Sequence, residues 1–214
     1  QGSLGPSMKY PGWTVNQIIG ERIPVSVVLG SLSLLIAILV GIPIGVIAAS
    51  RPNTWMDRVP MGFALIGICV PSFVFGPLLA LVFSLQLGWF PPCGWGSVSH
   101  LVLPSLALGL ITAAPLARLT RGELMEVYTL DYVRTARAKG VSPMRVRFVH
   151  ALRNGILPVV TYLGPAAAAL VSGSFVVESL FDVPGVGRLF VTAIINRDVP
   201  VILGTTLLYA VALL

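Results

Sequence analysis

The chain has 214 residues, of which 56% are hydrophobic and only 10% are charged, and its formal net charge is +6. An ordinary soluble domain carries about 25% charged residues, so this composition excludes a soluble fold, whose surface so few charges could not cover. The basic residues lack interleaved aromatic side chains and a recognisable nucleic-acid-binding motif, which argues against a nucleic-acid partner. The composition therefore predicts an all-α integral membrane protein.

Charge-free stretches mark the candidate membrane spans. Residues 23–50 contain no charged side chain, and a helix needs only about 20 apolar residues to cross the hydrocarbon core. The next such stretch, residues 59–117, is too long for one crossing and is interrupted by a segment rich in Gly, Pro and Trp at residues 88–96. It therefore predicts two crossings joined by a loop. In all, five spans are expected, at residues 24–49, 60–88, 100–118, 154–178 and 199–214.

Glycine and proline residues should modify these spans. Gly41 and Gly45 have the spacing that lets two helices approach closely in lipid. A helix tolerates an internal proline where neighbouring groups satisfy the freed carbonyls, so kinks around a transport pathway and ordinary packing kinks are both open interpretations. The prolines within the predicted spans are Pro71, Pro77, Pro104, Pro115 and Pro165.

The distribution of basic residues predicts the orientation in the membrane. If the loops around residues 51–58 and 118–153 share one side, that side holds ten basic residues and the other holds four. The positive-inside rule places the richer side in the cytoplasm. The ten are Arg51, Arg58, Arg118, Arg121, Arg134, Arg137, Lys139, Arg145, Arg147 and Arg153, and the four are Lys9, Arg22, Arg188 and Arg197. The chain then begins outside and ends inside, so we expect a preceding helix that this sequence lacks and six spans in the whole protein.

The cytoplasmic loop at residues 119–153 is predicted to form two short helices joined by a tight corner. Gly140 suits the position just after a helix C-terminus, and Ser142 followed by Pro143 suits the N-cap and first turn of the next helix. Apolar residues at intervals of three and four predict a packing face on that second helix, with basic residues between them. The apolar residues are Met144, Phe148, Ala151 and Leu152, and the basic ones are Arg145, Arg147 and His150.

At this corner the sequence resembles the inner-membrane permeases of ATP-binding-cassette importers. Residues 132–142 read YVRTARAKGVS and residues 150–158 read HALRNGILP, which is similar to the EAA-type loop of the peptide and nickel permease branch. Arg134, Thr135 and Arg153 depart from the general loop in the way that this branch does. Further short matches in the same order extend the resemblance over nearly the whole chain, at residues 4–7 (LGPS), 70–73 (VPSF), 181–187 (FDVPGVG) and 196–198 (NRD).

The resemblance implies a MetI-like permease bundle that moves oligopeptides or dipeptides across the bacterial cytoplasmic (inner) membrane by alternating access. It also implies the partners: a second, related permease in a heterodimer, two cytoplasmic ATPases that bind ATP and Mg, and an extracytoplasmic peptide-binding receptor. This chain would then perform no catalysis and hold no cofactor. Residues 1–23 would be a periplasmic segment after a missing first span, and residues 24–214 the transmembrane permease domain. Nickel, glutathione or another small solute is the alternative cargo, and a passive channel is the alternative class.

The same resemblance implies that the corner docks on the ATPases and couples them to the spans. The alternative is a solvated face attracted to anionic lipid, but that would not require the Gly140 corner. The expected coupling residues are Ala136, Lys139, Gly140, Val141, Ser142, Pro143 and Arg145.

Candidate residues of the substrate pathway are polar side chains within or near the spans. Glu178 could instead be an ordinary interfacial carboxylate, and serines also form hydrogen bonds between helices. No later span supplies a base to pair with Ser174, which argues against an intramembrane protease. His, Cys, Asp and Glu nowhere show metal-ligand spacing, so we expect no metal site. The pathway candidates are Ser72, Ser172, Ser174 and Glu178.

Overall fold

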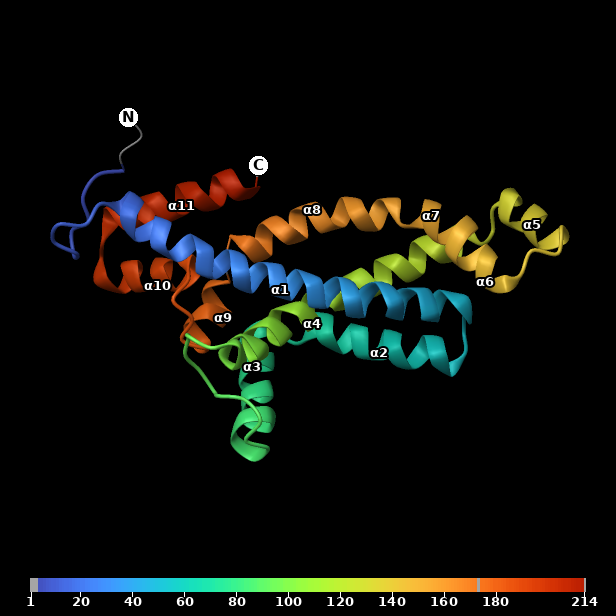
Figure 1. The fold of residues 1–214 in the computed structure, drawn as a ribbon, viewed down its shortest axis with the longest axis horizontal. Helices are drawn as coiled ribbons and strands as arrows, with labels where there is room; N and C mark the ends of the chain where they lie inside the picture. Colours follow the sequence, from blue (N-terminus) through green and yellow to red (C-terminus); the bar gives the residue numbers. More distant parts are fainter. Residues whose placement is uncertain (1–3, 173, 214) are drawn as a thin grey trace. The chain divides into compact units, whose positions relative to one another are not determined.

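The computed structural model describes residues 4–172 and 174–213. Apart from one antiparallel bridge between Pro6 and Thr14, these residues form helices and the loops between them (Figure 1). The helices are α1 (Val15–Ser50), α2 (Trp55–Cys69), α3 (Ser72–Ala80), η1 (Leu81–Gln86), α4 (Val98–Val127), α5 (Asp131–Ala138), α6 (Pro143–Arg145), η2 (Val146–Ala151), α7 (Leu152–Gly155), α8 (Leu157–Val171), α9 (Phe175–Leu180), α10 (Val186–Asn196) and α11 (Val199–Leu213). The first three residues of the expected segment 1–23, Gly173 in the fourth expected span and Leu214 in the fifth lie outside the described residues.

The expected spans coincide with apolar helices. Three stretches are long and apolar enough to cross a membrane, namely Val15–Ser50, Val98–Val127 and Leu157–Leu180. Helix α2 and the helix that follows it, Ser72–Gln86, make a fourth if they are counted together, and α11 is a shorter apolar helix. The number of helices that cross the bilayer therefore stays a prediction.

The second expected span, residues 60–88, is not one straight helix. It consists of two helices with a break between Cys69 and Ser72. Val70 and Pro71 both have extended backbone there, with ψ values of 119° and 147°. Proline disfavours the helical conformation of the residue before it and cannot donate the hydrogen bond that would continue the helix. Pro71 therefore breaks the span, whereas Pro77 and Pro165 lie inside α3 and α8.

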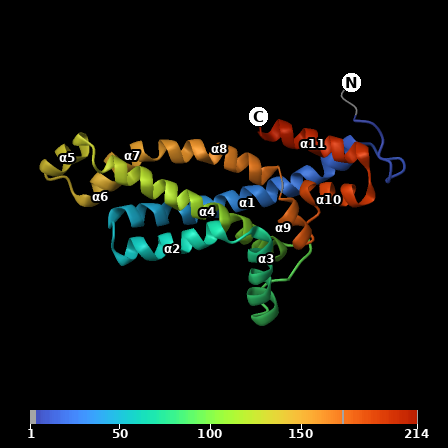
Figure 2. The ribbon, with the colours of Figure 1, turned by 180° about the vertical axis from the view of Figure 1, so that it is seen from behind.

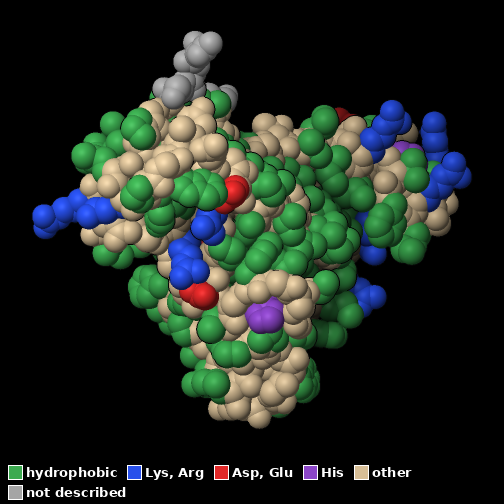
Figure 3. Space-filling view, turned by 60° about the vertical axis from the view of Figure 1, so that its left-hand side comes forward, with side chains coloured by type: hydrophobic (Ala, Val, Ile, Leu, Met, Phe, Trp, Pro, Cys, Tyr) green, Lys and Arg blue, Asp and Glu red, His purple; other side chains and the backbone are tan. Residues whose placement is uncertain are grey.

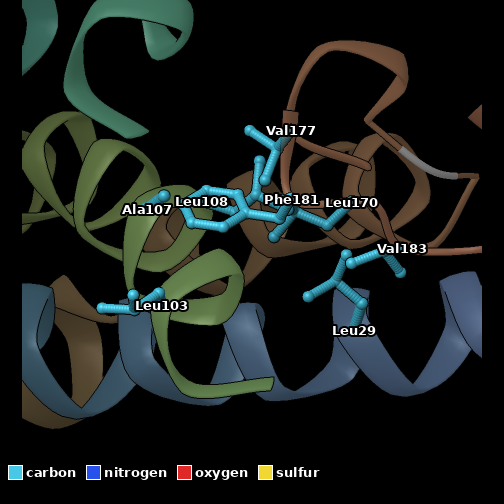
Figure 4. Close-up of a cluster of buried hydrophobic side chains, with 8 residues drawn as sticks. All are labelled: Leu29, Leu103, Ala107, Leu108, Leu170, Val177, Phe181 and Val183. Carbon is cyan, nitrogen blue, oxygen red and sulfur yellow. The ribbon is translucent and has the colours of Figure 1, made fainter. Parts of the chain in front are cut away.

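The described chain divides into two compact units that share α1, α4 and α8. The first unit comprises Gln1–Leu34, Pro71–Leu108 and Pro165–Leu214, and the second comprises Leu35–Val70 and Gly109–Gly164. In the first unit, Phe181 is only 1% exposed and lies in a cluster to which α1 contributes Leu29 and α4 contributes Leu103 (Figure 4). The other members are Ala107, Leu108, Leu170, Val177 and Val183.

In the second unit, the end of α1 and the start of α2 form a helical hairpin that is visible from both sides (Figures 1 and 2). Helix α4 packs closely on α1 at the two predicted glycines. A Cβ atom at Gly41 would lie 2.8 Å from the carbonyl oxygen of Ala113, and one at Gly45 would lie 2.5 Å from the Thr120 Cβ. The packing interpretation of these glycines is therefore confirmed.

Many apolar side chains remain exposed, as a helix surface in contact with lipid or other subunits requires. Hydrophobic side chains cover broad areas of the face drawn in Figure 3. On α11, Leu203, Leu207 and Val211 are 64%, 58% and 65% exposed and follow one another at intervals of four residues. These residues therefore form one uncovered apolar stripe along that helix.

Candidate functional site

The corner after α5 is closed by backbone hydrogen bonds around Gly140. The Gly140 N–H bonds the Arg137 carbonyl at 3.0 Å, and the Val141 N–H bonds the Ala136 carbonyl at 3.2 Å. This pair of bonds is the Schellman motif, which needs a left-handed residue directly after the helix cap. Gly140 has a φ of +75°, a conformation that other L-residues rarely adopt. The predicted position of Gly140, directly after the end of a helix, is therefore confirmed.

The next helix begins as predicted, with Ser142 as its N-cap residue. Pro143 occupies the first turn of α6, and the Val146 N–H bonds the Ser142 carbonyl at 3.0 Å. The Ser142 hydroxyl forms no capping hydrogen bond. Proline has no N–H to satisfy, and α6 is only three residues long, so the turn gains little from a side-chain acceptor. Ser142 thus acts through its backbone.

The corner packs against a buried apolar cluster. Val133 is fully buried and Ala136 is 7% exposed, and both lie on the inner face of α5. Val141, just past the turn, packs against the same cluster. The remaining members come from α1, α4 and the helices after the corner, namely Val46, Ala49, Leu124, Val127, Val146 and Ala151. The turn is therefore held on a packed base.

The predicted packing face of the second helix is partly wrong. Ala151 is fully buried, but Met144 and Phe148 are 63% and 49% exposed, and Val146 is packed instead at 2% exposure. Residues 146–151 form a π-helical segment, in which each turn contains an extra residue. The extra residue rotates the apolar pattern, so a spacing based on a regular α-helix places Met144 and Phe148 on the wrong side.

A polar network ties α5 to the segment that follows the corner. The Tyr132 hydroxyl donates to the His150 carbonyl at 3.2 Å and accepts from the Asn154 side-chain amide at 2.9 Å. The His150 Nδ1 lies 3.2 Å from the Arg145 carbonyl. These contacts fix α5, η2 and α7 to one another and support a corner that moves as a unit. Sequence reasoning missed them, because its only signal was the polarity of these residues.

The tip of the corner is exposed and carries both basic and apolar groups. Lys139, Gly140, Ser142, Pro143 and Arg145 are all exposed, whereas Ala136 is buried and Val141 is half-buried. The expected coupling residues therefore form one contiguous turn whose tip is accessible, with Ala136 and Val141 as its base. Such a turn can bind a protein surface through charge and through the exposed Met144 side chain.

A cavity of about 550 Å³ lies beside the base of the corner. The Arg137 guanidinium lies over the Tyr128 ring there, 5.6 Å from the ring centre, at a distance that allows a cation–π interaction. The cavity is lined by Ala49, Ser50, Pro52, Tyr128, Arg137, Val141, Pro143, Val146 and Arg147.

The expected pathway residues have local roles in the first unit. The Ser174 hydroxyl caps α9 by accepting from the Val177 N–H at 3.3 Å, and the Ser172 hydroxyl donates to the Ala169 carbonyl at 3.1 Å. Ser72 is half-buried at the start of α3. A pathway role for these serines stays a prediction.

Glu178 is fully buried at the junction between α9 and α10. Its carboxylate accepts from the Ser26 hydroxyl at 2.8 Å and from the Arg188 N–H at 3.1 Å. The Ser26 hydroxyl in turn accepts from the Val186 N–H at 2.9 Å. The Glu178 carboxylate and the Ser26 hydroxyl thus satisfy amides at the start of α10. These contacts support a structural role for Glu178, and its pathway role stays a prediction.

A second buried carboxylate was missed by sequence reasoning. Asp57 is 2% exposed and binds Arg121 through two hydrogen bonds of 2.5 and 2.7 Å. The Asn53 N–H donates to the same carboxylate at 2.9 Å. Arg121 and Asp57 are 64 residues apart, so no local pattern could have paired them. Among the described residues, no group of three or more His, Cys, Asp or Glu could hold a metal ion.

Comparison with known proteins identifies the family. Residues 41–214 match the family described as "Binding-protein-dependent transport system inner membrane component". The chain is 44% identical over 209 residues to "Oligopeptide transport system permease protein OppB" of Salmonella typhimurium, covering 97% of this chain and 68% of that protein. It is 46% identical over 211 residues to "Dipeptide transport system permease protein DppB" of Bacillus subtilis, covering 99% and 68%.

The fold also matches a solved importer. The inward-facing MetNI methionine ABC transporter superposes with a TM-score of 0.74 at 18% identity, over 92% of this chain and 90% of that chain. This likeness confirms the MetI-like all-α fold expected from the sequence. The chain therefore belongs to the family of inner membrane components of binding-protein-dependent transport systems, and it is a multi-pass, non-catalytic permease subunit of an ABC importer.

Proposed function

We propose that this chain is the permease half of an importer that carries oligopeptides or dipeptides across the bacterial cytoplasmic (inner) membrane. One observation carries the substrate assignment. Relatives from two different bacteria, at 44% and 46% identity over nearly the whole chain, are both named as peptide permeases. The alternative cargo is nickel, glutathione or another small solute.

The family implies an ATP-driven system with separate ATPase and substrate-binding subunits and a second permease. In the finer proposal, two cytoplasmic ATPases bind ATP and Mg, an extracytoplasmic receptor delivers the peptide, and the second permease is a distinct, related chain. A single permease half offers one wall of a pathway. Because unsatisfied polar groups in lipid each cost several kcal/mol, a peptide needs a water-filled cavity, which two halves can enclose between them.

The corner at residues 136–145 is the proposed contact with the ATPases. Its tip is exposed, its turn is closed by the Schellman bonds of Gly140, and its base is packed on the cluster around Val133 and Ala136. A turn built in this way can transmit ATPase closure to the spans as a rigid-body movement, and the spans then alternate between inward and outward access. The docking residues are Ala136, Lys139, Gly140, Val141, Ser142, Pro143 and Arg145.

The proposed topology puts residues 1–23 in the periplasm and residues 119–153 in the cytoplasm, within a transmembrane domain of residues 24–214. The excess of basic residues around 51–58 and 118–153 supports it. The test is cysteine labelling of intact cells after the native Cys69 and Cys93 have been replaced. A membrane-impermeant reagent should label Trp95→Cys and leave Ser142→Cys unreacted, and the reverse pattern would contradict the topology.

Reconstitution tests the transport function. Proteoliposomes containing the permease, its proposed partner, the ATPases, the receptor and ATP should take up labelled oligopeptide, and each component is omitted in turn. Uptake that is equal without ATP would show a passive channel. Full ATP-driven uptake without the second permease would refute the heterodimer. Uptake of nickel or glutathione in place of peptide would refute the substrate assignment.

A further inference from the structure

The second unit contains a cavity of about 420 Å³ between the start of α2 and α4, separate from the corner. Three arginines line it together with one carboxylate, so its charge is not balanced. Its lining residues are Asn53, Asp57, Arg58, Met61, Leu65, Arg118 and Arg121.

Two of the three arginines are available to an external anion. Arg121 donates two hydrogen bonds to the Asp57 carboxylate, which also accepts one from the Asn53 N–H. Arg58 and Arg118 are exposed, and neither forms an ion pair with a carboxylate of the described chain. The Asp57–Arg121 pair joins α2 to α4 and so holds the two exposed guanidiniums at one cavity.

Apolar groups continue the cavity along α2. Arg58, Met61 and Leu65 follow one another at intervals of three and four and therefore lie on one face of the helix. Leu65 is 52% exposed, and Ile68, one turn further on, is 44% exposed. A ligand that binds here thus meets positive charge at the start of α2 and an uncovered hydrocarbon surface beyond it.

We propose that this cavity binds the phosphate headgroup of an anionic phospholipid of the inner leaflet, through Arg58 and Arg118, with an acyl chain along Met61 and Leu65. Guanidinium groups bind phosphate through paired, charge-assisted hydrogen bonds, and basic pockets between helices on the cytoplasmic side suit anionic headgroups. A free phosphate would use the two arginines but not the apolar face, and an acidic segment of a partner subunit would likewise leave that face uncovered. The inference rests on the proposed orientation of the loops, not on the peptide cargo.

The test is native mass spectrometry of the complete transporter, titrated with phosphatidylglycerol or with phosphatidylcholine of the same acyl chains. The wild-type complex should retain phosphatidylglycerol preferentially. The double variant R58A/R118A should weaken that retention about tenfold or more, because the loss of each basic residue near a membrane surface should weaken binding about fivefold. The matched control R51A/R153A removes the same charge from exposed arginines that do not line the cavity, and it should retain the lipid as the wild type does.

Several outcomes would overturn the proposal. Equal loss in both double variants, or loss in neither, would show diffuse attraction to the membrane. Competition by inorganic phosphate as effective as that by the lipid would show a phosphate site without an acyl contact. Cross-linking of Met61→Cys to another subunit, with no lipid retained, would show that a protein covers the cavity. Should R58A/R118A fail to assemble, Met61→Asp serves instead and should weaken retention by repulsion; unchanged retention would refute the site.

This readout requires neither ATP hydrolysis nor peptide. Its failure is therefore distinguishable from failure of the proposed transport function.

Discussion

Two helix junctions of this molecule depend on glycine for different reasons. At the corner after α5, Gly140 has a φ of +75° and open space around it, since a Cβ atom would meet nothing within 4 Å. At the start of α10, a Cβ atom on Gly187 would lie 2.6 Å from the Phe175 nitrogen, and the backbone there is helical. The corner thus needs the conformational freedom of glycine, whereas the α10 junction needs its small size.

The two junctions also differ in exposure and in how their backbone hydrogen bonds are satisfied. The corner presents its tip to the outside and is closed by its own backbone bonds. The α10 junction is buried, and its amides are satisfied by the Glu178 carboxylate and the Ser26 hydroxyl. A turn can be both rigid and exposed when its backbone is satisfied locally, as at Gly140. A buried turn can instead use distant side chains, and it becomes sensitive to their loss.

Removal of the Glu178 carboxylate should have the largest effect on stability. Glu178→Ala leaves the buried Ser26 hydroxyl and the Arg188 N–H without their acceptor, and each such loss costs about 1–3 kcal/mol. We expect a loss of about 3 kcal/mol in the free energy of unfolding in detergent micelles. Glu178→Gln keeps one acceptor oxygen and should lose less. An alanine variant as stable as the wild type would show that the junction does not depend on this carboxylate.

Alanine substitutions at three glycines distinguish a requirement for small size from a requirement for a left-handed backbone. Gly187→Ala should cost about 2 kcal/mol because its methyl group meets backbone atoms. Gly140→Ala should cost about 1 kcal/mol because its left-handed backbone disfavours a side chain. Gly122 lies inside α4 with nothing within 4 Å of a Cβ atom, so Gly122→Ala is the control and should be neutral or slightly stabilising. Chemical denaturation measures all three, and an equal cost at positions 140 and 122 would remove the conformational argument.

A charge reversal at the corner should change coupling much more than stability. Arg145 is exposed, and Arg145→Glu should shift the free energy of unfolding by less than about 0.5 kcal/mol while it reverses a charge that is proposed to contact the ATPase. Gly140→Pro should have a similar functional effect, because proline fixes φ near −65°. Receptor-stimulated ATPase activity should fall towards the unstimulated rate in both variants, with normal insertion. Unchanged stimulation in both would argue strongly against docking.

A polar contact in the first unit should produce the smallest effect, a loss of local protection from hydrogen exchange in acid. Burial alone would raise the pKa of Asp198, but hydrogen bonds from the Ser7 hydroxyl and the Met8 N–H outweigh it and hold the pKa below its usual value. A lowered carboxylate pKa contributes stability that is complete above about pH 4, the unfolded value, and is lost as the pH falls through the folded value. Protection of the Met8 amide from hydrogen exchange, corrected for the intrinsic rate, should therefore decrease below about pH 4.

Asp198→Asn provides the matched variant for this effect. It should show weaker protection at neutral pH and a flatter response to acid, because the amide does not titrate in this range. If the variant and the wild type respond to acid alike, another group controls the segment around Met8.

Local signals in the sequence predicted the corner well. Gly140 and Pro143 are recognisable from their neighbours alone, because helix ends are determined within a few residues. Charge-free stretches likewise located the apolar helices. Pro71 was recognised as an interruption, but the complete break of the span into two helices was not, because the backbone conformation there depends on packing as well as on the missing N–H.

Features that join distant segments could not be predicted. The Asp57–Arg121 pair and the contact of Glu178 with Ser26 connect residues that are 64 and 152 positions apart. The exposure of Phe148 depends on a π-helical segment, and a pattern based on 3.6 residues per turn does not contain that information. Charge-free stretches and turn residues therefore located the elements, while the contacts that stabilise them required the structure.

The central claim is that the corner at residues 136–145 faces an ATPase subunit on the cytoplasmic side. The most direct measurement is photo-cross-linking in the assembled transporter, with a photoreactive residue at Ser142 in one variant and at Trp95 in another. The account predicts that position 142 cross-links to an ATPase subunit, more strongly when nucleotide closes the ATPases, and that position 95 does not. Cross-linking of position 142 to the receptor, or to no subunit in any nucleotide state, would contradict it.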